Sequence, residues 1–219
     1  MNTEIISKTY KDLPFCQREI MRYAGCSGGD EMLESLYKEC VEQAQKVLSY
    51  HVCYRRLELE VKGDLCDFSV LSLRSEKLAQ NLGGCHSVIL FAATVGVGID
   101  RLIAKYSRLS PVTALMFQAI GTAQVEALCD RFSADVSAQY STNLRPRFSP
   151  GYADLPLSAQ REIFDVLDCE RRIGLTLNES LLMSPTKSVT AFMGLTEGEQ
   201  TIKNSCMLCD KIDCVYRGV

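Results

Sequence analysis

The sequence predicts an α+β protein with a largely antiparallel sheet that is covered by helices. Helical and strand-like patterns mix along the 219 residues without the regular strand–helix–strand order that builds a parallel sheet. Long stretches repeat apolar residues at helical spacing, and the nearly apolar run 87–95 has the length and β-branched content of a buried strand. A chain of this length can bury roughly 70% of its unfolded surface, which is enough for a sizeable core.

The N-terminal half is predicted to contain two helices and two strands. Apolar residues recur every three or four positions from Glu31 to Leu48, which is typical of an amphipathic helix. Looser alternation predicts strands over 51–61 and 68–73, on either side of a Lys-Gly-Asp turn. A short helix is expected over 75–82, with Ser75 as its N-cap and two glycines after its end.

The longest helical pattern follows the buried strand 87–95. A Gly-Val-Gly turn leads into a helix from Ile99, but the third glycine of a dinucleotide-binding fingerprint is absent. The pattern over 111–136 predicts the longest helix, and its small residues at 119–123 would let another backbone come close.

The C-terminal part is predicted to contain one more helix and two strands. The helix is expected over 157–167, with Ser158 as its cap. The strands 175–183 and 188–195 are expected to pair with each other across a Ser-Pro-Thr turn.

Composition argues against several classes of protein. A net charge of −3 and no long basic run argue against a nucleic-acid-binding protein. The N-terminus has no apolar signal region, and the longest nearly apolar stretch, 88–99, is too short to span a bilayer. We therefore expect a cytoplasmic protein that binds neither nucleic acid nor membrane.

The segment Arg147–Tyr152, RFSPGY, is the clearest candidate binding loop. Pro150 fixes its own φ, and Gly151 permits a turn or a close approach that a Cβ would block. The arginine offers a fork for a carboxylate, and the tyrosine offers a flat ring for a planar base. Such a loop suits a small zwitterion joined to an aromatic heterocycle, and an ordinary surface turn is the alternative.

Two carboxylates stand one helical turn apart before this loop. Glu126 and Asp130 share one face of the helix predicted over 111–136. Either they form a solvated acidic edge, or one of them faces a cation such as Arg147 or a ligand's ammonium.

Three of the eleven cysteines cluster near the C-terminus. The other eight are scattered among apolar or helical contexts and are expected to be reduced and mostly buried. Cys206, Cys209 and Cys214 have spacing that suits zinc or an iron–sulfur cluster, although a fourth ligand is missing locally. A redox dithiol and inert thiols remain open as alternatives.

Two sequence blocks resemble one known family. The pattern R-x-x-x-G-Y at 147–152, followed by DCERRIGLTLNESLLMSPTKSVTAFMGL at 168–195, is similar to the activation domain of cobalamin-dependent methionine synthase. The first block resembles the S-adenosylmethionine-binding loop of that family. In this order the two blocks span about a quarter of the chain.

The resemblance implies a curved sheet covered by helices over residues 1–200 and a ligand in a shallow groove. The cysteine-containing tail over 201–219 is expected to be an addition to the family's domain. The resemblance also implies a set of S-adenosylmethionine-binding residues. These are Arg147, Ser149, Pro150, Gly151, Tyr152 and, through the ligand's ammonium, Glu126. The chain departs from the family in two respects: no paired tyrosines follow Met193, and the family's N-terminal aspartate has no clear counterpart.

The resemblance further implies a role in methionine biosynthesis. The chain would be a stand-alone activation subunit that supports reductive remethylation of inactive cob(II)alamin. Its partner would be a cobalamin-binding methionine synthase or another corrinoid protein, and flavodoxin or ferredoxin would supply the electron. The alternative is an electron-transfer or regulatory protein that binds a metal or an iron–sulfur cluster and keeps the fold without the nucleoside site.

Overall fold

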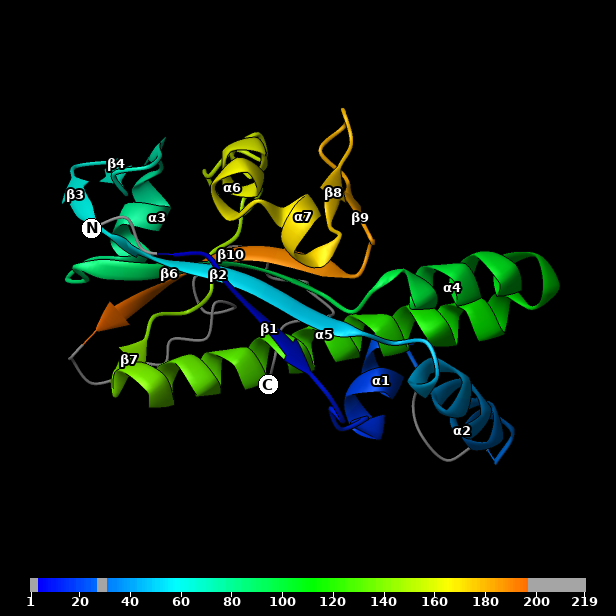
Figure 1. The fold of residues 1–219 in the computed structure, drawn as a ribbon. Coiled ribbons are helices and arrows are strands. Elements are labelled where there is room, and N and C mark those ends of the chain that lie inside the picture. The colour runs from blue at the N-terminus through cyan, green and yellow to red at the C-terminus, as the bar shows by residue number, and fades with distance from the viewer. Residues whose placement is uncertain (1–3, 27–30, 197–219) are drawn as a thin grey trace.

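The main sheet of the protein has five antiparallel strands. A computed structural model describes residues 4–26 and 31–196. In spatial order the strands are β1 (Ile6–Tyr10), β2 (Tyr50–Glu58), β6 (Ser87–Thr94), β10 (Ser188–Thr196) and β7 (Asn143–Leu144) (Figure 1). Every residue of β6 is buried, as its apolar composition predicts for a central strand covered on both faces.

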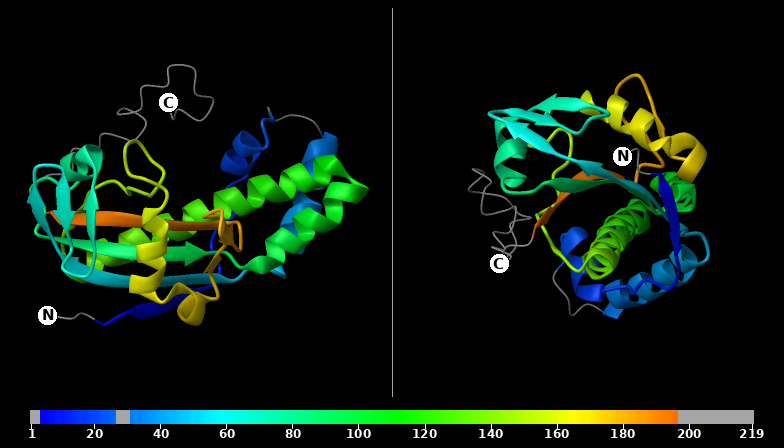
Figure 2. Two further views of the ribbon diagram at one scale, coloured as in Figure 1. Left: turned by 90° about the horizontal axis from the view of Figure 1, so that it is seen from above. Right: turned by 60° about the vertical axis from the view of Figure 1, so that its left-hand side comes forward.

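Four helices lie on one side of this sheet; the longest of them contacts the sheet, and the other three pack against that helix (Figure 1). They are α1 (Gln17–Tyr23), α2 (Glu31–Gln45), α4 (Val97–Leu109) and α5 (Pro111–Tyr140). The sheet curves around α5, as the view nearly along that helix shows (Figure 2). The Ser110 hydroxyl accepts a hydrogen bond from the Thr113 N–H, and Pro111 occupies the first turn, so both residues favour a helix start here.

Helix α5 is the central helix of this core. By length and composition it could cross a membrane, but 67% of its most apolar window is buried inside the protein. Its buried residues, including Phe117, Ile120 and Phe132, join Ile89 and Phe91 of β6 in one apolar cluster. The burial explains its apolar composition as that of a core helix.

Smaller elements cover the other face of the main sheet and form a second apolar cluster with it. The helices are α3 (Glu76–Asn81), α6 (Ala159–Leu167) and α7 (Cys169–Ile173). A three-stranded antiparallel sheet contains β3 (Glu60–Lys62), β4 (Leu65–Asp67) and β5 (Ser72–Arg74), and a two-stranded hairpin contains β8 (Thr176–Leu177) and β9 (Met183–Ser184). The predicted class, α+β with a curved antiparallel sheet covered by helices, is confirmed.

Several local predictions are also confirmed. Ser75 caps α3, since its hydroxyl accepts a hydrogen bond from the Leu78 N–H at 2.9 Å. The strand predicted over 87–95 is β6, and the longest predicted helix is α5, which continues to Tyr140. Of the eight dispersed cysteines, six are buried, and all eight are free thiols.

The predicted pairing of 175–183 with 188–195 is wrong. Residues 178–182 form a turn in which the Leu182 N–H donates to the Asn178 side-chain oxygen at 2.9 Å, so the first segment folds back on itself as β8 and β9. Strand β10 instead pairs with β6 and β7, because its side chains are almost all buried and need a central place in the sheet.

Two smaller predictions are wrong as well. The strand expected over 68–73 is interrupted by a turn, in which the Phe68 N–H donates to the Leu71 carbonyl and Ser69 has φ +67°. Ser158 does not cap α6 with its side chain, because its backbone is already helical (φ −59°, ψ −23°) and continues the preceding turn.

Candidate functional site

The predicted binding loop runs along the edge of the main sheet. After β7 the chain remains hydrogen-bonded to β10, since the Arg145 N–H donates to the Gly194 carbonyl at 2.8 Å. Phe148 and Phe192 then form an isolated antiparallel bridge, with N–H to carbonyl distances of 3.0 and 2.9 Å. The first half of the loop is therefore held as a short continuation of the sheet.

This extended conformation sends successive side chains in opposite directions. Phe148 is 5% exposed and lies in the cluster beneath α3 and α6, whereas the preceding Arg147 reaches α5 across the other face of the sheet. The Phe148 ring also meets Tyr152 edge-on, with centroids 5.4 Å apart. Phe148 anchors the loop from behind, a role that the sequence motif did not indicate.

Arg147 forms ion pairs with both carboxylates on α5. Its Nη2 donates to Glu126 Oε2 at 2.8 Å, and its Nη1 lies 3.0 Å from Asp130 Oδ1. The Arg147 side chain is 27% exposed, against 43% for Glu126 and 74% for Asp130. The structure thus brings Arg147 together with both Glu126 and Asp130.

The surroundings keep this guanidinium charged and the neighbouring thiol protonated. Burial by itself would lower the pKa of Arg147, but the Cys129 thiol and the two carboxylates outweigh it and raise that pKa. Burial raises the pKa of Cys129 to about 12, although Arg147 works against the rise. At neutral pH the site therefore contains one permanent cation, two carboxylates and a neutral thiol.

The second half of the loop is a tight turn. Gly151 has φ +83°, a backbone conformation that residues with a side chain rarely adopt, and its N–H donates to the Leu155 carbonyl at 2.9 Å. The Tyr152 N–H donates to the Ser149 carbonyl at 3.2 Å, and the Tyr152 side chain is part of the surface, with the residue 37% exposed. The Pro-Gly pair forms the turn that the sequence predicted.

Asp154 fastens this turn to α3. Its carboxylate accepts hydrogen bonds from the Ser75 hydroxyl at 2.5 Å and from the Glu76 N–H at 2.6 Å. The Ser75 hydrogen bond and the backbone donors hold the pKa of Asp154 below its ordinary value. The sequence contained no signal for this contact, because Asp154 and these two donors are 79 and 78 residues apart in the chain.

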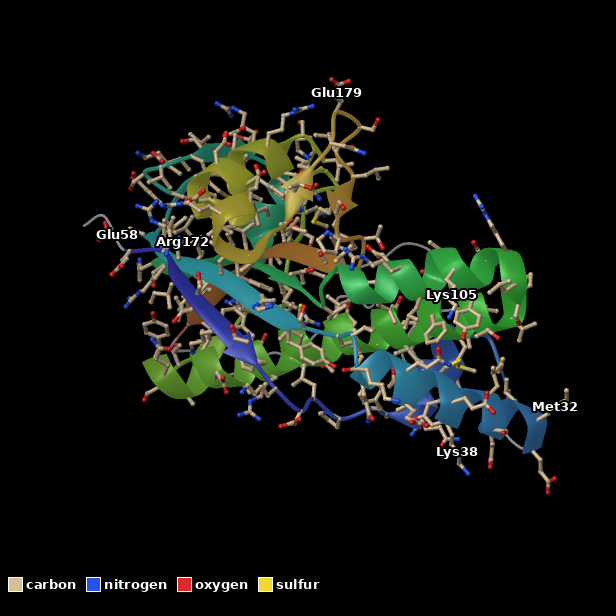
Figure 3. The ribbon with its side chains drawn as sticks, turned by 45° about the vertical axis from the view of Figure 1, so that its right-hand side comes forward. Met32, Lys38, Glu58, Lys105, Arg172 and Glu179 are labelled. Carbon is tan, nitrogen blue, oxygen red and sulfur yellow. The ribbon has the colours of Figure 1, made fainter. Side chains whose placement is uncertain are left out.

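The remaining residues to consider are the three tail cysteines and two exposed carboxylates. Cys206, Cys209 and Cys214 fall outside the described residues, and within residues 4–26 and 31–196 no group of three or more metal-ligating side chains occurs. Glu179 is exposed at the β8–β9 turn and points outward (Figure 3). Glu162 is exposed on α6, so it serves as a control carboxylate for the experiments below.

The fold and the charged loop beside α5 define a class of protein in which an antiparallel sheet curves around one long helix and presents a charged loop at its edge. The sequence model for "Vitamin B12 dependent methionine synthase, activation domain" matches residues 71–201, which is more than half of the chain. The chain belongs to this family. The matched region includes both the Arg147 loop and the block 168–195.

A solved structure has the same fold. The MetH reactivation domain bound to AdoHcy superposes with a TM-score of 0.67 at 16% sequence identity, covering 90% of this chain and 80% of that one. No curated protein sequence matches the chain significantly. The structural likeness establishes the fold, and the family match establishes membership.

Proposed function

We propose that this protein binds S-adenosylmethionine at the Arg147 loop and thereby supports reactivation of a cobalamin-carrying methionine synthase. The observation that carries the proposal is the contact of Arg147 with Glu126 and Asp130. A guanidinium and a carboxylate 2.8 Å apart offer the complement of a zwitterion, one partner for each of its two charges.

In the proposed complex the ligand exchanges partners with this ion pair. Arg147 turns from Glu126 to the methionine carboxylate, and Glu126 accepts the ligand's ammonium. Ser149, Pro150 and Gly151 would border the nucleoside, and the partly exposed ring of Tyr152 would contact the adenine. AdoHcy in the structural neighbour supports this ligand class, because it is what remains of S-adenosylmethionine after methyl transfer.

The chemistry belongs to the ligand and to a partner that carries the cobalamin. A donor such as flavodoxin or ferredoxin would supply one electron to the partner's inactive cob(II)alamin, and S-adenosylmethionine would supply the methyl group for the reduced cobalamin and leave as AdoHcy. The side chains of this chain bind and orient the ligand, and Phe148 and Asp154 keep the loop in place. We place this activity in the cytoplasm.

Calorimetric titration with S-adenosylmethionine tests the site. Arg147→Ala should weaken binding by about 2–5 kcal/mol, since it leaves a carboxylate without its partner in a partly desolvated site. Glu126→Gln should also weaken binding through the ammonium, whereas the matched variant Glu162→Gln on α6 should bind as the wild type does. Wild-type affinity in Arg147→Ala would refute the assignment.

We also propose that residues 201–219 form a separable tail in which Cys206, Cys209 and Cys214 bind one zinc ion or iron–sulfur cluster. Their spacing supports this proposal, since loss of any one thiolate from a shared metal removes most of the metal. Truncation after Lys203 should remove the metal and leave S-adenosylmethionine binding unchanged. Equal metal content in the full-length and truncated proteins, both prepared anaerobically, would exclude the tail as a metal site.

A further inference from the structure

A second cation lies beside α5 in a cavity of its own. The cavity has a volume of about 420 Å³, which lies in the range typical of small-molecule sites. It is lined by Tyr23, Leu115, Gln118, Ala119, Thr122 and Lys187. Thr122 is four residues before Glu126, so the cavity begins about one helical turn from the Arg147 site.

The positive charge of Lys187 has few neighbouring groups that stabilise it. Its Nζ donates to the Thr122 hydroxyl at 3.0 Å, and no described carboxylate, in residues 4–26 or 31–196, lies within ion-pair distance. Burial lowers the pKa of Lys187, and only the field of Asp100 opposes that change. Both carboxylate oxygens of Asp100 accept hydrogen bonds from Thr186, its backbone N–H at 2.7 Å and its hydroxyl at 2.6 Å.

The backbone at Lys187 is held firmly on both sides. The Lys187 carbonyl accepts from the Val95 N–H at 3.1 Å, which ties this residue to the end of β6. Next along the chain, the Ser188 hydroxyl is 2.8 Å from both the Thr94 hydroxyl and the Pro185 carbonyl. Together with the Thr186–Asp100 bonds, these contacts fix the origin of the lysine side chain.

The stem of Lys187 is also guided along α5. A Cβ on Gly121 would lie 2.9 Å from Lys187 Cγ and 3.2 Å from its Cε, so the side chain runs across the helix where only a glycine leaves room. A glycine inside a helix costs about 1 kcal/mol relative to alanine. Its presence here directs the ammonium into the cavity rather than away from it.

We propose that this cavity binds a small monocarboxylate with an apolar body. One half-buried ammonium matches one negative charge, and the Gln118 amide can donate a second hydrogen bond to the same carboxylate. Leu115 and Ala119 form an apolar wall for the rest of the molecule. A doubly charged phosphate would require a second cation, and the lining residues contain none.

This site is separate from the S-adenosylmethionine site, and the proposal does not depend on that function. Tyr23 is close to both, since it lines the cavity and its pKa is raised by burial and by the charge of Glu126. The two ligands can therefore influence each other's affinity, but each has its own cation.

Heteronuclear NMR titrations of the full chain test the proposal with three probes: isocaproate, its uncharged amide isocaproamide, and inorganic phosphate. Isocaproate should shift the amide signals of Thr122 and Lys187. The variant Lys187→Met, which keeps the stem and loses the charge, should bind isocaproate about tenfold more weakly. The control Lys105→Met, at an exposed position on α4 (Figure 3), should bind as the wild type does.

Three outcomes would overturn the proposal: equal binding of isocaproamide and isocaproate, unchanged isocaproate affinity in Lys187→Met, or tighter binding of phosphate than of isocaproate. Lys187→Gln and thermal melts of each variant establish that a loss of binding is not a loss of fold. S-adenosylmethionine should still bind Lys187→Met at wild-type affinity. If Lys187→Met lost both S-adenosylmethionine and isocaproate binding, the two ligands would share one site and the proposal would be refuted. If only Arg147→Ala lost S-adenosylmethionine binding, the proposal of a separate carboxylate site would stand.

Discussion

Arg147 and Lys187 are two cations beside the same helix, and the protein surrounds them in opposite ways. Arg147 has carboxylates at 2.8 and 3.0 Å, whereas Lys187 has one hydroxyl at 3.0 Å. A ligand at Arg147 must exchange partners with an existing ion pair, but an anion at Lys187 forms a new one. The Arg147 arrangement suits a zwitterion: its carboxylate takes the place of Glu126 at the guanidinium, and its ammonium gives Glu126 a new positive partner. The Lys187 arrangement suits a simple anion.

Two glycines should differ in how well they tolerate a side chain: Gly194, whose carbonyl accepts from the Arg145 N–H just before the Arg147 loop, and Gly121, beside the Lys187 stem. In Gly194→Ala the new Cβ lies 2.6 Å from the buried Cys85 Sγ and 3.0 Å from Leu82 Cδ2, which should cost about 1–3 kcal/mol of unfolding free energy. In Gly121→Ala the new Cβ lies against the flexible Lys187 stem and 3.2 Å from the buried Ile99 Cγ1, but a helix-propensity gain of about 1 kcal/mol offsets these contacts, so the loss of stability should be smaller than in Gly194→Ala. Urea unfolding measures both variants.

Equal destabilisation by the two substitutions would show that the Lys187 stem is as rigid as the core behind the Arg147 loop. Gly121→Ala should also displace the lysine and weaken isocaproate binding, while S-adenosylmethionine binding stays unchanged. The same pair of variants therefore tests whether the two cations are independent.

Removal of the Asp154 carboxylate should weaken ligand binding at Arg147 but not at Lys187. Asp154→Ala loses an exposed cap on α3, which should lower stability by less than about 1 kcal/mol. Because the turn loses its attachment to Ser75, S-adenosylmethionine affinity should fall severalfold, and isocaproate affinity should not change. Calorimetry with both ligands measures the difference, and a loss of isocaproate binding would contradict it.

The same carboxylate gives a pH dependence of known sign. Its pKa is lower in the folded protein than the ordinary 3.8, so its contribution is present above pH 3.8 and is lost as the pH falls through the folded-state value. Wild-type stability should therefore decrease in this acidic range more steeply than that of Asp154→Ala. Parallel slopes in urea unfolding series would show that Asp154 does not contribute to stability.

Asp130→Asn should have the smallest effect. The Asp130 side chain is 74% exposed, so its ion pair with Arg147 contributes only about 0–1 kcal/mol to stability. Because the substitution removes one competitor for the guanidinium, S-adenosylmethionine affinity should rise roughly twofold, and the gain should shrink in high salt. Weaker binding in this variant would show that Asp130 contacts the ligand rather than competing with it.

The sequence predicted the parts of the fold that depend on local pattern. Buried strand β6, helix α5 and the Ser75 cap follow from apolar periodicity and capping residues near one another in the chain. The partner of strand β10 could not be predicted in this way, because 175–183 and β6 are both apolar enough to pair with it. The tight turn at Asn178, whose side chain accepts a hydrogen bond from the Leu182 N–H, folds residues 175–183 back on themselves and so excludes them as the partner of β10.

In the candidate site, too, features that depend on local sequence could be predicted, and contacts between distant residues could not. Arg147 and Glu126 were selected from a motif and from helical spacing, and the structure places them in contact. Lys187 lies in the second family-like block, but nothing in that block indicated a binding role, since its environment is created by Gly121 and Tyr23, which are distant from it in sequence. Phe148 was part of the motif, but its role depends on a bridge to Phe192 that the sequence does not encode locally.

The bridge between Phe148 and Phe192 has a consequence for how this loop can change in length. Because Arg147 and Phe148 face opposite sides of one pleat, inserting a single residue between Arg147 and the bridge would carry the guanidinium to the side of the apolar cluster. An insertion of two residues would restore its direction. A loop built on this edge can therefore gain residues between the arginine and the bridge only in even numbers if the arginine is to keep facing α5.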